Sequence, residues 1–201
     1  MNAAQHVNAF WSVPCVYPKD YIIFSEGEHC KRMGKILKGS VALVHYDEHG
    51  EISIMAMLKT GDTFGDILLF ADTPYYMGHL IVYEPATIQF LHKDNVVQLL
   101  QHDPDFKNWF IRSLSNKAHR INVSNKILQQ PSLKQKLIMY FEQQSRMLQS
   151  PYVHIPSMEN LAAELNVARP SVSRTLSELI KEGYLQRNRK TYTLNTAMCR
   201  I

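Results

Sequence analysis

The sequence predicts an α+β protein in three parts: an N-terminal antiparallel β-roll, a long central helix, and a C-terminal helix pair followed by a hairpin. Three observations predict this order. Short apolar runs broken by glycine fill residues 17–91, no Pro or Gly interrupts residues 105–130, and basic amphipathic segments follow residue 131. We place the three parts at residues 1–100, 101–130 and 131–201.

Composition and cysteine usage indicate a soluble protein of the cytoplasm. The 201 residues are 45% hydrophobic and 20% charged, which is ordinary for globular domains. The three cysteines, Cys15, Cys30 and Cys199, are scattered, which argues against a disulfide framework. No Lys or Arg precedes Lys19, and no apolar run approaches the length of a membrane span. We therefore expect a cytoplasmic protein with no signal peptide and no membrane segment.

The net charge of +4 is unevenly distributed along the chain. Residues 1–131 hold 12 Lys and Arg against 13 Asp and Glu, whereas residues 132–201 hold 10 against 5. A basic C-terminal part indicates a polyanionic partner. A solvated basic surface would give the same count, so charge alone does not decide.

The β-roll is predicted from β-forming runs with turn signals about every ten residues. The runs are residues 21–24, 34–46, 52–58, 79–83 and 86–91. "DEHG", ending at Gly50, is a good hairpin turn because glycine tolerates a positive φ. We expect six to eight strands.

The central helix carries a pattern typical of a two-stranded coiled coil. Apolar residues step by three and four, with one asparagine at an a position; the predicted seam is Ile111, Leu114, Ala118, Ile121, Asn125 and Leu128. A helix of about 25 residues is ~37 Å long, more than one small roll covers. We therefore predict a homodimer; a helix packed only on its own domain is the alternative.

The C-terminal part reads as a winged helix-turn-helix. An amphipathic helix over residues 132–150 precedes a short strand at 152–155 and a helix at 157–165 with Ser157 as its N-cap. After a turn at 166–168, a second helix runs to Gly183, a suitable C′ residue. Residues 184–194 form a hairpin with its tip at 188–190.

The second helix of the pair has two different faces. Its apolar face is Val172, Leu176, Leu179 and Ile180; its polar face is Arg169, Ser171, Ser173, Arg174, Ser177 and Lys181. Pro170 suits a first helical turn, where its missing N–H costs nothing. Arginine reads the N7/O6 edge of guanine and hydroxyls hold phosphates, so we predict a helix in the major groove of duplex DNA. Arg187, Arg189 and Lys190 on the wing would add phosphate contacts. Solvated surface residues are the alternative.

"GDTFGD" (61–66), the long helix and "ARPSVSRTLSELIKEGYL" (168–185) together resemble the CRP/FNR family of bacterial transcription regulators, over residues 14 to 195. The resemblance implies a roll of the cyclic-nucleotide-binding type that senses an effector. It also implies a homodimer on a palindromic operator, with RNA polymerase as a partner if the protein activates. Arg169, Pro170 and Arg174 occupy places where members contact bases, and Ser157 and Ser171 occupy places where hydroxyls hold the DNA backbone. Many members have glutamate at the place of Pro170, so we expect a different half-site.

The resemblance also bears on the effector. In the cyclic-AMP-binding members the stretch matching residues 61–70 supplies a glycine backbone and a ribose-binding carboxylate, here Gly65 and Asp66. The arginine that pairs with the cyclic phosphate falls near Tyr76, and residues 71–86 contain no Lys or Arg. A buried phosphate without a cation is costly, so we predict an effector other than cyclic AMP. Tyr75, Tyr76, Met77 and His79 complete the candidate effector site, although core and rim positions would explain them equally.

No cofactor or metal is predicted. An iron–sulfur cluster of the FNR type needs four cysteines, and three scattered ones do not form that set. Haem binding, known in one branch of the family, stays open as a haem- or redox-dependent alternative because the chain has nine histidines. His29, His45, His49, His79 and His92 show no ligand spacing.

The sequence has two further interpretations, a cupin-like metal enzyme and a protein-binding scaffold. The spacing of Gly39, His45, Asp47 and Glu51 is similar to the metal motif of cupin enzymes. The cupin motif has a second histidine where this sequence has Asp47. Because the motif is incomplete, we predict no enzyme and no catalytic residues. A protein-binding roll with a helical scaffold is the third reading, which the basic helix and wing argue against.

Overall fold

The computed structural model describes residues 10–47, 49–50, 52–155, 157–189 and 191–195. The chain divides into two compact units, residues 1–116 and 117–201, and the boundary lies within one long helix. None of the described helices combines the length and the hydropathy that a membrane span requires.

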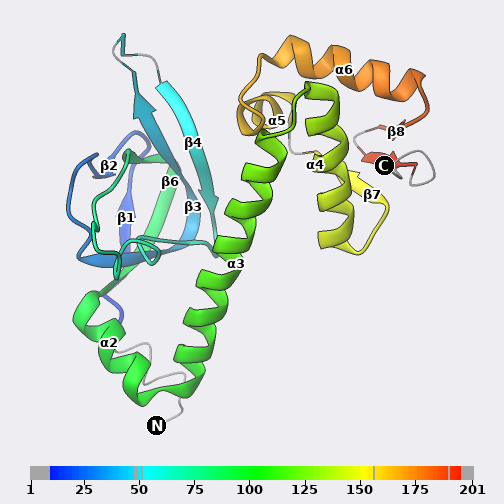
Figure 1. Ribbon diagram of the computed structural model, residues 1–201. Coiled ribbons are helices and arrows are strands. Elements are labelled where there is room, and N and C mark those ends of the chain that lie inside the picture. The colour runs from blue at the N-terminus through cyan, green and yellow to red at the C-terminus, as the bar shows by residue number, and fades with distance from the viewer. Residues whose placement is uncertain (1–9, 48, 51, 156, 190, 196–201) are drawn as a thin grey trace. The chain divides into compact units, whose positions relative to one another are not determined.

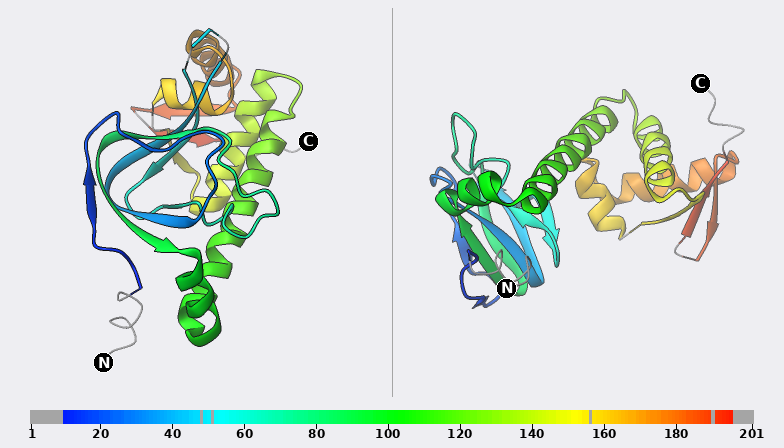
Figure 2. Two further views of the ribbon diagram at one scale, coloured as in Figure 1. Left: turned by 90° about the vertical axis from the view of Figure 1, so that its left-hand side faces the viewer. Right: turned by 90° about the horizontal axis from the view of Figure 1, so that it is seen from below.

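The first unit is built on an antiparallel sheet of six strands. They are β1 (Cys15–Tyr17), β2 (Ile22–Phe24), β3 (Arg32–Tyr46), β4 (Ile52–Lys59), β5 (Thr63–Phe64) and β6 (His79–His92). The order is β1-β6-β3-β4, with β2 also on β6 and β5 also on β3. The long strands β3 and β6 pair along nearly their whole lengths, and the sheet curls around a common interior (Figures 1 and 2).

A bend in β3 and β6 allows this curling. Their register shifts three times between Ile36 and Val41, around Gly39. Gly39 has a φ of 83°, and a Cβ built on it would lie 2.2 Å from the carbonyl oxygen of Pro85. Only glycine fits both the backbone angle and this close approach. Residues 79–83 and 86–91, which the sequence divides into two runs, therefore form one continuous strand that carries Pro85 at its irregular point.

The interior of the roll is aromatic. Phe24, Phe64, Tyr76 and Phe90 are buried. The Phe24 ring contacts the other three, Phe64 also contacts Phe90, and the Phe24 and Tyr76 rings are stacked with centroids 4.6 Å apart. Ring pairs at such distances add about 0.5–1.5 kcal/mol each beyond their buried area. The roll is thus filled by its own side chains at this point.

Two helices follow the sheet. α2 (Lys93–His102) buries Val96 and Leu99, and α3 (Pro104–Leu128) starts where Asp103 Oδ1 accepts the Phe106 N–H at 2.8 Å. The Asp-Pro pair thus supplies both a cap and a first-turn proline. α3 has 25 residues, which corresponds to ~37 Å.

The second unit contains the helices and strands of the C-terminal part. They are α4 (Leu133–Leu148), β7 (Tyr152–His154), α5 (Met158–Glu164), α6 (Arg169–Lys181), β8 (Leu185–Asn188) and β9 (Thr191–Leu194). The three strands pair antiparallel in the order β7-β9-β8. One core joins them, with Phe141, Leu161, Leu165, Leu176 and Tyr192 among its fully buried side chains.

The predicted fold class is confirmed: an antiparallel roll, a long helix and a winged helix-turn-helix occur in that order (Figure 1). The six strands of the described roll fall within the predicted range. The three-part division at residues 100 and 130 stays a prediction.

Candidate nucleic-acid interface

The helix-turn-helix is formed by α5, a short turn and α6. Ser157 caps α5, because its hydroxyl accepts the Asn160 N–H at 3.0 Å. Asn166 then adopts a left-handed conformation with a φ of 53°, and the Val167 N–H donates to the Ala162 carbonyl at 3.0 Å. Asparagine tolerates this conformation better than most residues, so the sequence itself specifies a tight turn.

The apolar face of α6 holds it on the rest of the unit. Val172, Leu176 and Leu179 are buried, and they belong to the same core as Leu161, Ala162 and Leu165. α6 ends in a Schellman motif in which Tyr184 N–H donates to Leu179 O (2.9 Å) and Gly183 N–H donates to Ile180 O (3.1 Å). Gly183 therefore ends the helix as its C′ residue, as the sequence predicts.

The opposite face of α6 is open to solvent. Arg169, Pro170, Ser173 and Arg174 are exposed and Ser171 is half-buried. Pro170 lies in the first turn of α6, and the N-cap residue Ala168 makes no side-chain capping bond. The first-turn N–H groups and the positive end of the helix dipole thus lie beside the exposed arginine and hydroxyl side chains, an arrangement suited to phosphate.

Arg169 is held by an acid from the other helix. Its Nε lies 2.6 Å from Oε1 of Glu159, in the first turn of α5. The pKa of Glu159 is lowered, mainly because its carboxylate accepts a hydrogen bond from its own backbone N–H, and secondarily because Arg169 is positive. Sequence reasoning missed this pair, since a spacing of ten residues across a turn carries no periodic signal.

The wing presents two described cations. Arg187 Nε donates to the Arg189 carbonyl at 2.9 Å, and Arg189 has a positive φ of 55° in the turn. Both side chains belong to exposed residues, whereas Lys190 lies outside the described residues.

The predicted dimer seam lies along α3. Ile111 is 54% exposed and Ile121 is 49% exposed, which is unusual for isoleucine. Ala118 and Asn125 are also exposed, while Leu114 and Leu128 are half-buried. The chain by itself thus leaves most of the seam uncovered.

The residues predicted to bind an effector do not gather in one place. Tyr76 is buried, whereas Tyr75 is 50% exposed and Met77 is 70% exposed, because neighbouring residues face opposite ways. The Tyr76 hydroxyl lies 3.5 Å from Cys30 Sγ, and a Cβ built on Gly65 would lie 3.0 Å from that hydroxyl. Tyr76 therefore lies directly over Gly65, and the space beside this glycine is filled by the chain itself.

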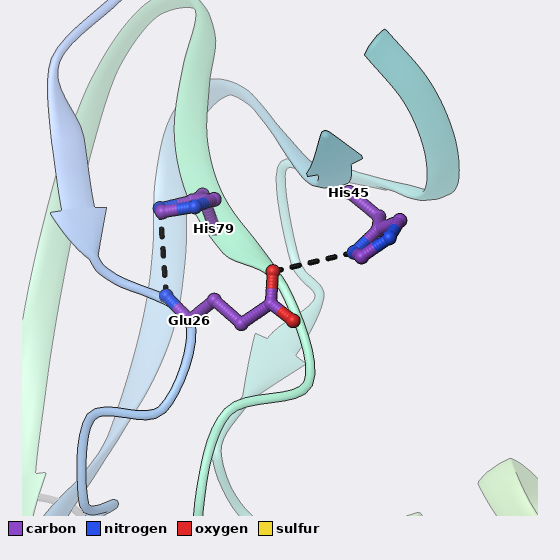
Figure 3. Close-up of polar contacts among 3 residues, drawn as sticks. All are labelled: Glu26, His45 and His79. Atoms are coloured by element: carbon purple, nitrogen blue, oxygen red, sulfur yellow. Dashed lines mark hydrogen bonds and ion pairs between the residues drawn. The ribbon is translucent and has the colours of Figure 1, made fainter. Parts of the chain in front are cut away.

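Asp66 and His79 are also engaged within the chain. Asp66 is buried and accepts the Thr63 hydroxyl at 2.8 Å. His79 Nδ1 lies 3.4 Å from the Glu26 backbone N–H, and the Glu26 carboxylate in turn lies 3.3 Å from His45 Nδ1 (Figure 3).

One cation of the roll was not predicted from the sequence. The guanidinium of Arg32, at the start of β3, lies 4.1 Å from the Phe90 ring centroid and 5.3 Å from that of Phe24. Such cation–π contacts are about 0.5–2 kcal/mol each. Only the folded sheet brings residue 32 beside residue 90, so no local motif could predict the contact.

The enzyme reading gains no support from the roll. His45 pairs with Glu26, and Asp47 accepts the His49 backbone N–H at 2.8 Å within the hairpin turn; Glu51 lies outside the described residues. Within the described ranges, no group of three or more His, Cys, Asp or Glu side chains is placed to hold a metal ion.

Comparison with known families agrees with this geometry. Residues 14–103 match the cyclic nucleotide-binding domain and residues 135–197 match the Crp-like helix-turn-helix domain, together about three quarters of the chain. The chain belongs to the CRP/FNR family of transcription regulators. Members of this family bind DNA through the helix-turn-helix, are typically dimeric, and are regulators rather than enzymes.

Individual relatives are distant. The chain is 30% identical over 89 residues to the cAMP-activated global transcriptional regulator CRP of Pasteurella multocida, covering 44% of this chain and 43% of that protein. It therefore spans less than half the length of that relative. The chain is 23% identical to the global nitrogen regulator of Nostoc over 199 residues, a match that covers 93% of this chain and 87% of that protein.

A solved CRP/FNR-type structure has the same fold. A mutant of CooA from Carboxydothermus hydrogenoformans superposes with a TM-score of 0.70 at 18% identity, over 94% of this chain and 85% of that one.

Proposed function

We propose that this protein is a homodimeric, sequence-specific DNA-binding transcription regulator that works in the cytoplasm and has no catalytic activity. The observation that carries the proposal is the exposed polar face of α6, with Arg169 and Arg174 turned to solvent while the apolar face is buried. In this proposal, residues 1–100 bind the effector, residues 101–130 form the dimer contact, and residues 131–201 bind DNA.

The dimensions of α6 support a place in the major groove. Its 13 residues span ~20 Å, and the groove is about 12 Å wide, enough for one helix. Arg169 and Arg174 would read bases, with Pro170 beside them. Ser157, Ser171, Ser173, Arg187, Arg189 and Lys190 would hold the DNA backbone.

A second copy of the chain is the proposed cover of the α3 seam. Two exposed isoleucines ten residues apart on one helix, Ile111 and Ile121, support pairing with an identical helix. A two-fold dimer would present two α6 helices about one turn of DNA apart, and so read a palindrome. If the protein activates transcription, RNA polymerase is a further partner.

The effector is proposed to be a small molecule other than cyclic AMP. Tyr76, near the place where the resemblance puts the arginine of cyclic-AMP-binding members, carries no positive charge, and burial and the nearby Cys30 raise its pKa. Arg32, a cation at the start of β3, already makes cation–π contacts with Phe24 and Phe90. We expect no heat of binding when cyclic AMP is titrated into the protein by calorimetry; a saturable heat would overturn this part of the proposal.

Selection of bound sequences from random DNA duplexes tests the proposed function. The expected product is an inverted repeat with half-sites about one helical turn apart. A set of sequences without a common motif would contradict the proposal.

A further inference from the structure

The contact between Glu159 and Arg169 involves one of the two arginines proposed to read bases. Glu159 belongs to the first turn of α5 and Arg169 is the first residue of α6, so the pair links the two helices of the motif. Both side chains remain largely open to solvent, at 64% and 62% exposure. A solvent-exposed ion pair contributes little to stability, about 0–1 kcal/mol, so stability alone does not explain its place.

Glu159 lies two residues after Ser157, in the first turn of α5. Its own backbone N–H, the charge of Arg169 and the Ser157 hydroxyl lower its pKa. Ser157 in turn caps α5 through the Asn160 N–H. The carboxylate therefore stays charged at neutral pH. Glu159 thus links the N-terminal end of α5, where Ser157 lies, to the guanidinium of Arg169.

The atom through which Arg169 is held matters for recognition. The 2.6 Å contact is made by Nε, one of the three nitrogens of the guanidinium. A guanidinium has five N–H donors in a rigid plane, and a pair of them can bond N7 and O6 of guanine together. Fixing Nε sets the plane of the group and directs the terminal donors, which reduces the orientational freedom lost on binding.

The charge of Glu159 also acts on DNA directly. A carboxylate on a face that meets phosphates opposes sequence-independent binding, which depends on positive charge alone. Such repulsion raises specificity by weakening the wrong complexes more than the right one.

We propose that Glu159 is a positioning residue for sequence readout: it orients Arg169 toward one base pair of the half-site and weakens binding to other DNA. This inference rests on the proposed function.

The test uses the full-length protein and two duplexes, the selected operator and its scrambled sequence. Glu159→Gln keeps the shape of the side chain and removes its charge. We expect this variant to bind the scrambled duplex more tightly and to lose at least about fivefold in the ratio of operator to scrambled affinity. Against single-base variants of the operator, its discrimination should fall at one base pair of each half-site. In an Arg169→Ala background, Glu159→Gln should cause no further loss of preference at that base pair.

Glu182→Gln is the matched control. Glu182 is another exposed acid of the same unit and is paired with Lys134, so the variant removes the same charge from an ion pair outside the proposed face. It should leave the affinity ratio unchanged. Melting curves of all variants keep a folding defect separate from a loss of readout.

The outcomes are distinguishable. If wild-type protein prefers the operator and Glu159→Gln keeps the same ratio, whether or not its melting temperature changes, this inference is wrong and the proposed function stands. An equal loss of preference at that base pair on Glu159→Gln in the wild-type and Arg169→Ala backgrounds would also overturn it. If the wild-type protein has no sequence preference, the proposed function fails and the inference fails with it.

Discussion

The two units of this protein place their informative residues in opposite environments. In the roll, Tyr76 and Asp66 are buried and bonded to neighbours of the same chain. In the helix-turn-helix, Arg169 and Arg174 are exposed, on a helix whose other face buries Val172, Leu176 and Leu179. The buried members of the predicted effector site thus belong to the interior of the first unit, whereas the predicted DNA-binding arginines of the second unit are open to solvent.

This difference teaches how the two regions tolerate change. Substitutions in the roll should be felt as loss of stability, because the altered side chains are packed. Substitutions on the face of α6 should be felt as loss of binding preference, because little packing depends on them.

The largest expected effect is on Tyr76. Replacing it with alanine removes a buried ring that stacks on Phe24, and we expect a loss of about 3–5 kcal/mol in the free energy of unfolding. Both tryptophans, Trp11 and Trp109, lie in residues 1–116, so their fluorescence in urea reports on this unit alone. The neighbouring Tyr75→Ala, at an exposed site, is the control and should cost far less. Equal losses in the two variants would show that Tyr76 is not part of the core.

A backbone change in the same unit tests the bend of the roll. Gly39→Ala should destabilise it by more than the ~1–2 kcal/mol that a left-handed conformation costs an ordinary residue. The extra loss is expected because the new Cβ meets the Pro85 carbonyl. Gly61→Ala, with a φ of 94° and open space around it, measures the conformational part alone. If both variants melt at the same temperature, the close approach to Pro85 has no energetic weight.

In the second unit, Arg174→Ala should leave stability unchanged and reduce discrimination between the operator and single-base variants by about 1–3 kcal/mol. The reason is that a bidentate arginine contact carries sequence information, while the exposed side chain supports no core. Competition binding to a panel of duplexes measures the discrimination. Arg146→Ala, an exposed arginine of α4, is the control. Arg174 would lose its assigned role if the two variants had the same preferences.

The smallest expected effect concerns the cap of α5. Ser157→Ala removes the acceptor for the Asn160 N–H and should cost about 1 kcal/mol in stability. Thermal melting followed by circular dichroism detects this, with Ser173→Ala as a surface-serine control. A neutral Ser157→Ala would mean that the capping bond is not formed in solution.

The dimer prediction concerns α3, which contributes residues to both units. Asn125→Leu should tighten the α3 seam or change its register, since an apolar residue replaces a polar one at an a position. Light scattering across a dilution series reports the change in oligomer mass. An identical dilution curve for both proteins would remove Asn125 from the seam.

Local sequence signals predicted most of the second unit. Ser157, Pro170 and Gly183 each act within one turn of the chain, as cap, first-turn proline and C′ residue, so their roles can be read from spacing. The same holds for the apolar face of α6. The Glu159–Arg169 pair was missed because it depends on the angle between two helices rather than on a repeat.

The roll was predicted as a class but not in its details. Alternating apolar runs indicate strands, yet the continuity of β6 through Pro85 depends on the partner strand and on Gly39. The cation–π contact between Arg32 and Phe90 joins residues 58 positions apart. Such contacts follow from the register of the folded sheet, which no short stretch of sequence specifies.

The most direct measurement is the affinity of the wild-type protein for the selected operator and for its scrambled duplex across a salt series. The account predicts that both affinities fall as salt rises, because phosphate contacts release counterions, while the operator stays tighter by about 10³-fold or more. Equal affinity for the two duplexes at every salt concentration would contradict the claim that α6 reads DNA sequence.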